Sequence, residues 1–341
     1  MDLVLIALLG IGFIVGAAVG SNDETWSPAV GAHILTVTAA VAIGAIINFV
    51  GAVSLGGGVS NKVGGELVNY TPMTNEMVFA ILISMAIWLL VASATKGLPI
   101  STTQCIVGAV MGIAAYAAFL GMTGWGADTI NWGIVIEIFA GWIVSPIIGF
   151  FIAGVVYLGV RRFQRRAQGF TGRERQEQIA GWGLVIFLLI TSLSRGGNDV
   201  ANAVAPLVVM PMFQAPVVIN GLVLPGYIVP LIAGGLGMAM GLIVVGRKVI
   251  KTLATEVVTL SPSSALSASV SVSLVMFVGT YFGFPLSGTH VLVAALIAVG
   301  FVAKTDVSSK QVKNIIISWI ITVPISAVLA IAIFAGMLFI I

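Results

Sequence analysis

The sequence predicts an all-α polytopic membrane protein made of two inverted-topology repeats of transmembrane helices, with broken helices or helical hairpins at a central site. Three observations lead to this fold class. The composition is too apolar for a surface in water, long apolar runs alternate with short polar clusters, and two polar motifs occur once in each half of the chain.

The composition makes lipid the solvent for much of the chain. Of the 341 residues, 59% are hydrophobic and only 8% are charged, whereas about 25% of the residues in a globular domain are charged. So few charges cannot cover the surface of a chain of this length. A helix needs about 20 apolar residues to cross a bilayer core, so we expect about ten to twelve spans.

Long unbroken apolar runs, such as 78–91 and 323–341, identify the spans as helices. A membrane β-strand alternates apolar and polar residues over about ten positions, and backbone groups inside an unbroken run can be satisfied only by a helix. The first span, 3–19, has no basic residue before it, so we interpret it as a retained helix and not as a cleaved signal peptide. The single cysteine, Cys105, excludes an internal disulfide.

The most polar segment lies near the middle of the chain. It holds six of the fifteen basic residues, namely Arg161, Arg162, Arg165, Arg166, Arg173 and Arg175. The positive-inside rule places such a loop in the cytoplasm; a regulatory or lipid-binding role is the alternative to a plain solvated loop. This linker, 161–180, divides the chain into a first repeat, 1–160, and a second repeat, 181–341.

Two motifs are duplicated in the same order on either side of the linker. Their copies are Gly20-Ser21-Asn22-Asp23 with Gly196-Gly197-Asn198-Asp199, and Pro99-Ile100-Ser101-Thr102-Thr103-Gln104 with Pro285-Leu286-Ser287-Gly288-Thr289-His290. If each half crosses the membrane an odd number of times, the halves are inverted and both termini lie outside. Inverted repeats are typical of secondary transporters, with the site near the midplane where the repeats meet. A symmetric scaffold without that role is the alternative.

Asp23 and Asp199 are the most informative acidic residues. Each ends an apolar run, and a carboxylate at membrane depth costs several kcal/mol or more. The glycines before each Asn-Asp pair allow the helix to unwind, and oxygens around an unwound segment form a dry site for a hard cation. We therefore predict that a coupling cation is bound by Asn22, Asp23, Asn198 and Asp199. The alternative is that these residues merely cap helices.

The Pro-x-Ser-x-Thr motifs predict the opposite chemistry. Proline suits the first turn of a helix and the hydroxyls can cap it, so each motif presents free N–H groups and a partial positive charge to an anion. An ordinary capped helix is the alternative. The predicted anion-binding residues are Ser101, Thr102, Thr103, Gln104, Ser287, Gly288 and Thr289, with Asn202, Asp23 and Thr25 beside them.

Other polar residues near the motifs receive weaker predictions. Lys96 and Arg195 border the motifs, and we expect them to extend to the membrane surface; assisting the anion is the alternative. Glu24 adds an oxygen in the first copy only. Asn48, inside an apolar run, is expected to hydrogen-bond between helices.

These residues resemble the inorganic phosphate transporter (PiT) family, whose hallmark is a duplicated Gly-Ala-Asn-Asp-Val-Ala-Asn-Ala stretch. Residues 197–203 match it with Gly197 in place of the alanine, and the first copy keeps Gly-x-Asn-Asp but has Trp26 in place of the second asparagine. The family's Pro-x-Ser-x-Thr-His is intact at 285–290 and ends in Gln104 in the first half.

The resemblance implies uptake of inorganic phosphate with Na⁺ or H⁺ around a shared central site. The Asn-Asp pairs would then serve the coupling ion and the substrate, and the Ser-Thr helix starts would bind phosphate. Na⁺ is favoured because amide, hydroxyl and carbonyl oxygens form a cage, whereas proton relays chain Asp, Glu and His. Moving one charge through ~100 mV is worth ~2.3 kcal/mol, so divalent phosphate predicts at least two Na⁺. No cofactor and no nucleic acid are expected, the lipid bilayer is a partner, and a homo-oligomer is left open.

Alternative functions remain at this point. Sulfate or a proton-coupled oxyanion would suit the same helix starts. An intramembrane aspartyl protease would also need two membrane aspartates, but Asn198 precedes Asp199 and the helix starts would have no role. The chain has no Walker sequence, so ATP does not drive it directly, and we expect no enzyme.

Overall fold

The computed structural model describes residues 3–68, 73–95, 99–165, 169–219, 221–256 and 258–340. Within these ranges the chain is helical apart from one short hairpin, and nine helices are long and apolar enough to cross a membrane. The first-half helices are α1 (Leu3–Ser21), α2 (Ser27–Gly31), α3 (Val37–Asn61, extended by a π-helical turn, Lys62–Glu66), α4 (Asn75–Thr95), α5 (Thr102–Phe119) and α6 (Trp132–Gln164).

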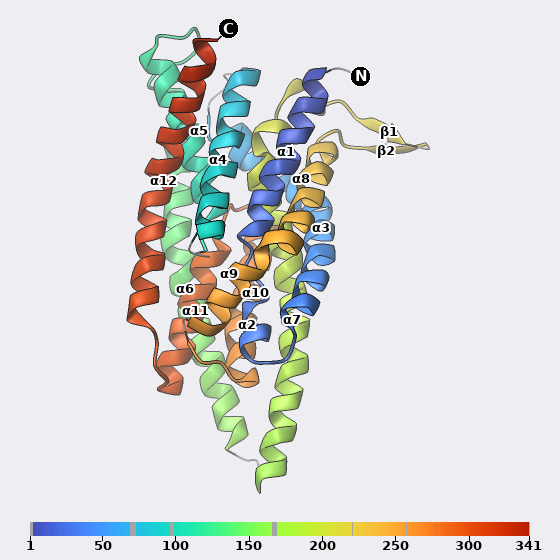
Figure 1. Cartoon of the computed structure of the whole chain (residues 1–341), viewed down its shortest axis with the longest axis vertical. Helices are drawn as coiled ribbons and strands as arrows, with labels where there is room; N and C mark the ends of the chain where they lie inside the picture. Colours follow the sequence, from blue (N-terminus) through green and yellow to red (C-terminus); the bar gives the residue numbers. More distant parts are fainter. Residues whose placement is uncertain are drawn as a thin grey trace.

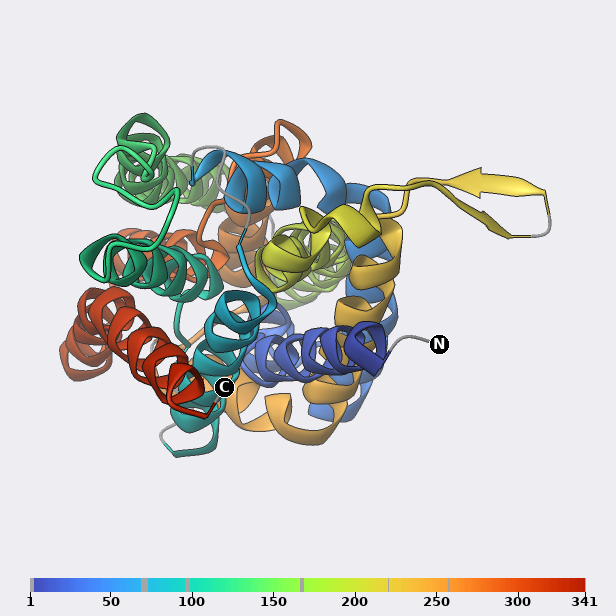
Figure 2. The ribbon, with the colours of Figure 1, turned by 90° about the horizontal axis from the view of Figure 1, so that it is seen from above.

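The second half begins with α7 (Gly169–Val208), the longest helix. After a 3₁₀ turn (Pro211–Phe213) comes an antiparallel hairpin of β1 (Val217–Ile219) and β2 (Leu222–Leu224), which projects sideways from the bundle in Figure 2. The all-α prediction did not include this hairpin. The remaining helices are α8 (Ile228–Gly241), a π-helical turn (Leu242–Gly246), α9 (Arg247–Glu256), α10 (Pro262–Tyr281), α11 (Gly288–Ala303) and α12 (Ser309–Leu338).

The described residues hold nine candidate spans, fewer than the roughly ten to twelve expected. Two expected spans form one helix, α7, and α11, with 16 residues, is shorter than a full span. The apolar stretches 182–194 and 200–213 both fall largely in α7, which stays helical through Gly196 and Gly197. The predicted unwinding there is wrong. These glycines serve close packing: a Cβ on Gly196 would lie 2.1 Å from the Asn48 carbonyl oxygen on α3. In the first copy, by contrast, α1 ends at Ser21 and α2 begins at Ser27.

The outer faces of the bundle are apolar, as contact with lipid requires. Large side chains on α6 and α12 are well exposed, for example Ile136 at 67%, Val155 at 68% and Ile320 at 70%. The interior contains two buried apolar clusters, one including Ile81 and Ile106 and a second including residues of α10 and α11. The charged residues described below are therefore buried within an apolar bundle.

Helix packing pairs elements of one half with elements of the other. Helix α1 packs on α8 and α7 on α3, while α5 packs on α12 and α11 on α6. In Figure 1, α1 starts at the end of the molecule where α12 finishes, and the end of α6 and the start of α7 lie at the opposite end. The same view places α5 in the upper part and α11 in the lower part, and a hydrogen bond from Thr103 to Leu286 joins their starts.

Candidate functional site

Both Pro-x-Ser-x-Thr motifs start a helix, as predicted. Ser101 is the N-cap of α5 and its hydroxyl accepts a hydrogen bond from the Gln104 N–H at 3.3 Å. Ser287 caps α11 in the same way, accepting from the His290 N–H at 3.4 Å. Both serines are buried. Each motif thus places a helix N-terminus, with its free N–H groups and positive dipole end, inside the protein.

The asparagine of each Asn-Asp pair holds the motif of its own half. The Asn22 side chain donates to the Ile100 carbonyl oxygen at 2.7 Å, and the Asn198 side chain donates to the Phe284 carbonyl oxygen at 3.0 Å. The Asn22 side-chain oxygen also accepts from Ser93 at 3.2 Å and from the Ile100 N–H at 3.4 Å. These two side chains fix where α5 and α11 begin.

The two helix starts are linked directly to each other. The Thr103 hydroxyl on α5 donates to the Leu286 carbonyl oxygen just before α11, at 2.9 Å. Asn202 on α7 donates to that same hydroxyl at 3.0 Å and to the Asn198 side-chain oxygen, also at 3.0 Å. The anion-binding elements predicted from separate halves therefore form one site.

Asp23 sits in a hydrogen-bond network between α1, α3 and α7. Its Oδ1 accepts from the Thr25 N–H at 3.0 Å and hydroxyl at 2.6 Å, and its Oδ2 accepts from Asn48 Nδ2 at 2.7 Å. The Asn48 oxygen in turn accepts from Ser192 on α7 at 2.6 Å, and the Trp26 indole donates to that hydroxyl at 3.3 Å. The interhelical role predicted for Asn48 is confirmed, whereas Ser192 and Trp26 were not predicted to take part.

Arg195 occupies the centre of the site, contrary to the prediction that it extends to the membrane surface. Its guanidinium contacts Glu24 Oε1 (Nη1, 2.5 Å) and Asp199 Oδ2 (Nη2, 3.0 Å; Nε, 3.1 Å), and Nη1 lies 3.9 Å from Asp23 Oδ1. The reason is that α7 continues unbroken past residue 195, so this side chain starts deep in the bundle next to three carboxylates. Lys96 lies outside the described residues.

The charged cluster of Asp23, Glu24, Arg195 and Asp199 is closed to solvent, since no member is more than 3% exposed. Taking charges out of water costs several kcal/mol each, which only close partners can offset. Glu24 also accepts a hydrogen bond from the Thr289 hydroxyl on α11 at 2.8 Å. The cluster therefore joins the Asn-Asp motifs to the start of α11.

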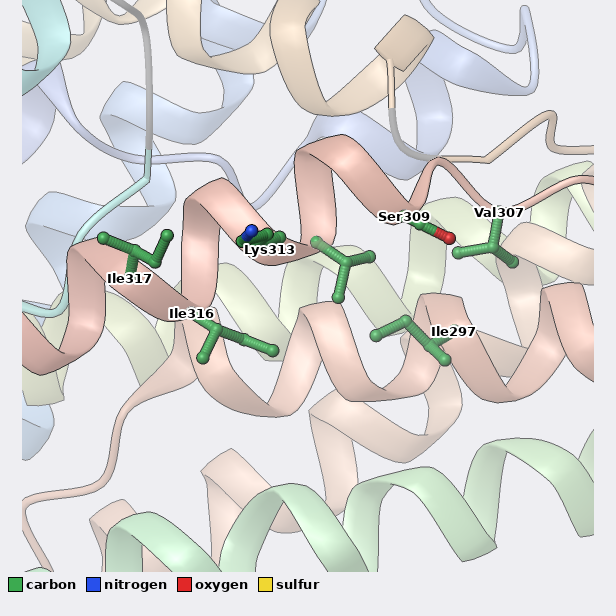
Figure 3. Close-up of a pocket in the computed structure, with 7 residues that line it drawn as sticks. Ile297, Val307, Ser309, Lys313, Ile316 and Ile317 are labelled. Atoms are coloured by element: carbon green, nitrogen blue, oxygen red, sulfur yellow. The ribbon is translucent and has the colours of Figure 1, made fainter.

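Gln104 and His290 are placed differently from the other motif residues. Both line a cavity of about 500 Å³ between α6 and α12, together with Trp142, Pro146 and Pro324. The His290 ring packs on Trp319, with a centroid distance of 3.9 Å. Another cavity, of about 390 Å³, lies between α11 and α12 and is lined by apolar side chains, Ser309 and Lys313 (Figure 3); it includes no residue of either motif.

Comparisons with known proteins show the family to which the chain belongs. Residues 17–330 match the phosphate transporter family. The chain belongs to this family. A Pyrococcus furiosus protein named as a phosphate permease is 29% identical over 99% of this chain and 97% of its own length. The inorganic phosphate transporter 2-1 of Arabidopsis thaliana chloroplasts is 26% identical, covering 95% of this chain and 70% of its own.

A solved structure described as the sodium-dependent phosphate transporter superposes on the whole chain. The TM-score is 0.84 at 25% identity, and the match covers 100% of both chains. The resemblance to the PiT family and the helical, multi-pass membrane fold are thereby confirmed. The family is one of transporters, so the protein is not an enzyme and the aspartyl protease alternative is set aside.

Proposed function

We propose that the protein imports inorganic phosphate together with Na⁺ by alternating access, through a site between the starts of α5 and α11. One observation carries this proposal: two buried helix N-termini, one from each half, are joined through Thr103 and Leu286 beside a closed cluster of three carboxylates. The helix starts supply positive potential for an anion and the carboxylates supply negative potential for cations.

Phosphate is held by N–H groups and hydroxyls at the two helix starts. The first N–H groups of a helix lack partners within it. Since Ser101 and Ser287 already accept from the N–H groups of Gln104 and His290, the first two N–H groups of α5 and of α11 remain for oxyanion oxygens. The Ser101 and Ser287 hydroxyls keep their capping role. The proposed phosphate residues are Ser101, Thr102, Thr103, Gln104, Asn202, Ser287, Gly288, Thr289, Asp23 and Thr25, with Gln104 the most remote by its place in the α6–α12 cavity.

Na⁺ is bound beside the two Asn-Asp pairs, with Asp23 and Asp199 supplying charge. Oxygen ligands suit a hard cation, and the Asp23 carboxylate lies beside the hydroxyl oxygen of Thr25. Asn22 and Asn198 belong to this cation site too. Because their amide groups hold Ile100 and Phe284, they act mainly by fixing its geometry.

The halves act as two inverted repeats, 1–160 and 181–341, joined by the linker 161–180. The packing supports this, because exchanging α1 with α7, α3 with α8, α5 with α11 and α6 with α12 leaves the set of packed pairs unchanged. The opposite placement of α5 and α11 in Figure 1 agrees. If the basic linker lies in the cytoplasm, the N-terminal end of α1 and the C-terminal end of α12, at the other side of the bundle, face outside.

Uptake of labelled phosphate into proteoliposomes tests the proposal. We expect uptake driven by an inward Na⁺ gradient and lost when choline replaces Na⁺ at fixed pH. Undiminished uptake in choline would point to protons as the coupling ion. A large excess of sulfate should leave phosphate uptake unchanged; strong competition would make sulfate the better substrate assignment.

A further inference from the structure

Three of the positions at which the site departs from its own internal symmetry concern charge or close packing around Arg195. Aligning the two copies of the motifs places Val19 opposite Arg195 and Glu24 opposite Val200. In the second pair of motifs, Thr102 stands opposite Gly288. The second half therefore carries an additional cation, Arg195, and lacks a side chain at Gly288, whereas the first half carries an additional anion, Glu24.

These three departures are in contact with one another. Arg195 Nη1 lies 2.5 Å from Glu24 Oε1. A Cβ on Gly288 would lie 2.6 Å from Nε and 2.9 Å from Cζ of Arg195. The missing side chain thus lets the guanidinium rest against the first turn of α11, and the opposite charge of Glu24 faces it. The three positions form a single unit.

Glu24 stands where an oxyanion would stand. Its Oε1 accepts from the Arg195 guanidinium and from the Thr289 hydroxyl (2.8 Å) at the start of α11. A guanidinium combined with donors of a helix start is a donor set that proteins use for phosphate oxygens. The second oxygen, Oε2, is fully buried and has no hydrogen-bond partner. The carboxylate is therefore only partly satisfied in this position.

Arg195 can exchange one partner while keeping the other. Its Nε and Nη2 contact Asp199, one turn along α7, while Nη1 faces Glu24. A guanidinium has five N–H donors in a fixed plane, so Asp199 can hold the group in place when Glu24 leaves. The release of Glu24 would then free Nη1 and the Thr289 hydroxyl together.

From this geometry, and resting on the proposed function, we propose that Arg195 is a substrate-binding residue and that Glu24 occupies the place of the phosphate in the empty carrier. Phosphate displaces the Glu24 carboxylate and takes over the Arg195 Nη1 and Thr289 donors, while Asp199 keeps the guanidinium in position. On release of phosphate, Glu24 returns. This competition weakens phosphate binding and so assists release on the far side of the membrane.

Two variants separate this role from that of a purely structural ion pair. Glu24→Gln removes the competing charge and is expected to lower the half-saturation concentration for phosphate about tenfold, the scale of a charge-assisted hydrogen bond. The double variant Glu24→Gln with Arg195→Gln keeps the net charge of the cluster but lacks the guanidinium. It is expected to raise that concentration at least about tenfold over Glu24→Gln. A purely structural pair predicts equal half-saturation concentrations for Glu24→Gln and the double variant, because the guanidinium then makes no contact with phosphate.

The experiment compares four proteins in proteoliposomes: wild type, both variants and Glu137→Gln, a matched control at a partly exposed ion pair with Lys62. Gel filtration in detergent confirms that each is folded. Equal affinities of Glu24→Gln and the double variant, or no gain in Glu24→Gln, overturn the inference and leave the proposed function intact. If the wild type takes up no phosphate, the proposed function fails, and the same four proteins are titrated with sulfate. The inference then requires a lower half-saturation concentration for sulfate in Glu24→Gln than in the wild type and in the double variant.

Discussion

At the scale of single residues, the site depends on side chains that satisfy one another across the two halves. Asp23 accepts hydrogen bonds from Thr25 and from Asn48, whose oxygen is held by Ser192 of the other half. Removing one partner of a buried charge leaves the other uncompensated, which is costlier than losing both. Single substitutions here therefore report on charge and on hydrogen bonding at once.

Asp23→Asn is expected to abolish Na⁺-coupled uptake, because the negative charge that balances the cation is lost. Both carboxylate oxygens accept hydrogen bonds, so the new amide group must direct its N–H₂ at a donor, with a cost of about 1–3 kcal/mol in folding free energy. Labelled phosphate uptake and the thermal unfolding midpoint measure the two effects. Asp306→Asn, at an exposed aspartate, is the matched control. Na⁺-dependent uptake at the wild-type rate would remove Asp23 from the mechanism.

Gly288→Ala is expected to raise the half-saturation concentration for phosphate about tenfold or more. The added Cβ would lie 2.6 Å from Arg195 Nε, so the guanidinium must leave the first turn of α11. Gly10→Ala in α1 is a suitable control, since a Cβ there meets nothing within 4 Å. Equal affinities of the two variants would show that the position of Arg195 against α11 is unimportant.

At the scale of the elements, local sequence rules predicted where helices start. They failed where packing against another helix determines the conformation or the position of a side chain. Pro followed by Ser is a local signal for an N-cap, and both Ser101 and Ser287 cap as expected. On sequence alone, Gly196 marks a point where the helix unwinds. In the structure it stays helical, and its lack of a side chain allows α3 to pack closely against α7. The depth of Arg195 likewise depends on Glu24, a residue from the other half that the sequence marked only as an additional oxygen. Long-range pairing of this kind has no local signature.

Asn22→Ala is expected to destabilise the start of α5. The Ile100 carbonyl oxygen would lose its 2.7 Å partner in a buried place, which costs about 1–3 kcal/mol and should lower the thermal unfolding midpoint. Added phosphate should raise the unfolding midpoint of the variant by less than it raises that of the wild type, because the helix starts that bind phosphate are displaced. Asn61→Ala, at an exposed position, should change neither value. An unaltered midpoint in Asn22→Ala would mean that the hydrogen bond does not hold the helix start.

At the scale of the whole molecule, the charge carried per cycle follows from the site and the membrane potential. Bringing divalent phosphate into a negative interior of ~100 mV costs about twice ~2.3 kcal/mol, and two monovalent cations cancel this charge. We expect at least two Na⁺ for each phosphate. Parallel fluxes of labelled sodium and labelled phosphate in proteoliposomes give this ratio directly. A ratio of one would contradict the expectation and require a further counter-charge.

The orientation of the whole chain can be tested with thiols. Cys105 is buried, so it should stay silent toward a membrane-impermeant maleimide. Phe170 is 87% exposed within the basic linker and Phe339 is 91% exposed after α12, which makes both suitable sites for cysteine. In intact cells we expect Phe339→Cys to be labelled at once and Phe170→Cys only after permeabilisation. The reverse pattern would invert the proposed topology.

The bond between Thr103 and the Leu286 carbonyl has a consequence for the transport cycle. It joins the two halves of the molecule at the proposed phosphate site, so it must break if the two helix starts move apart. A phosphate oxygen that accepts a hydrogen bond from the Thr103 hydroxyl would replace the Leu286 carbonyl oxygen as its acceptor, so binding of the anion would break this bond. In the proposed cycle, the binding of phosphate would therefore weaken one of the contacts that join the two halves.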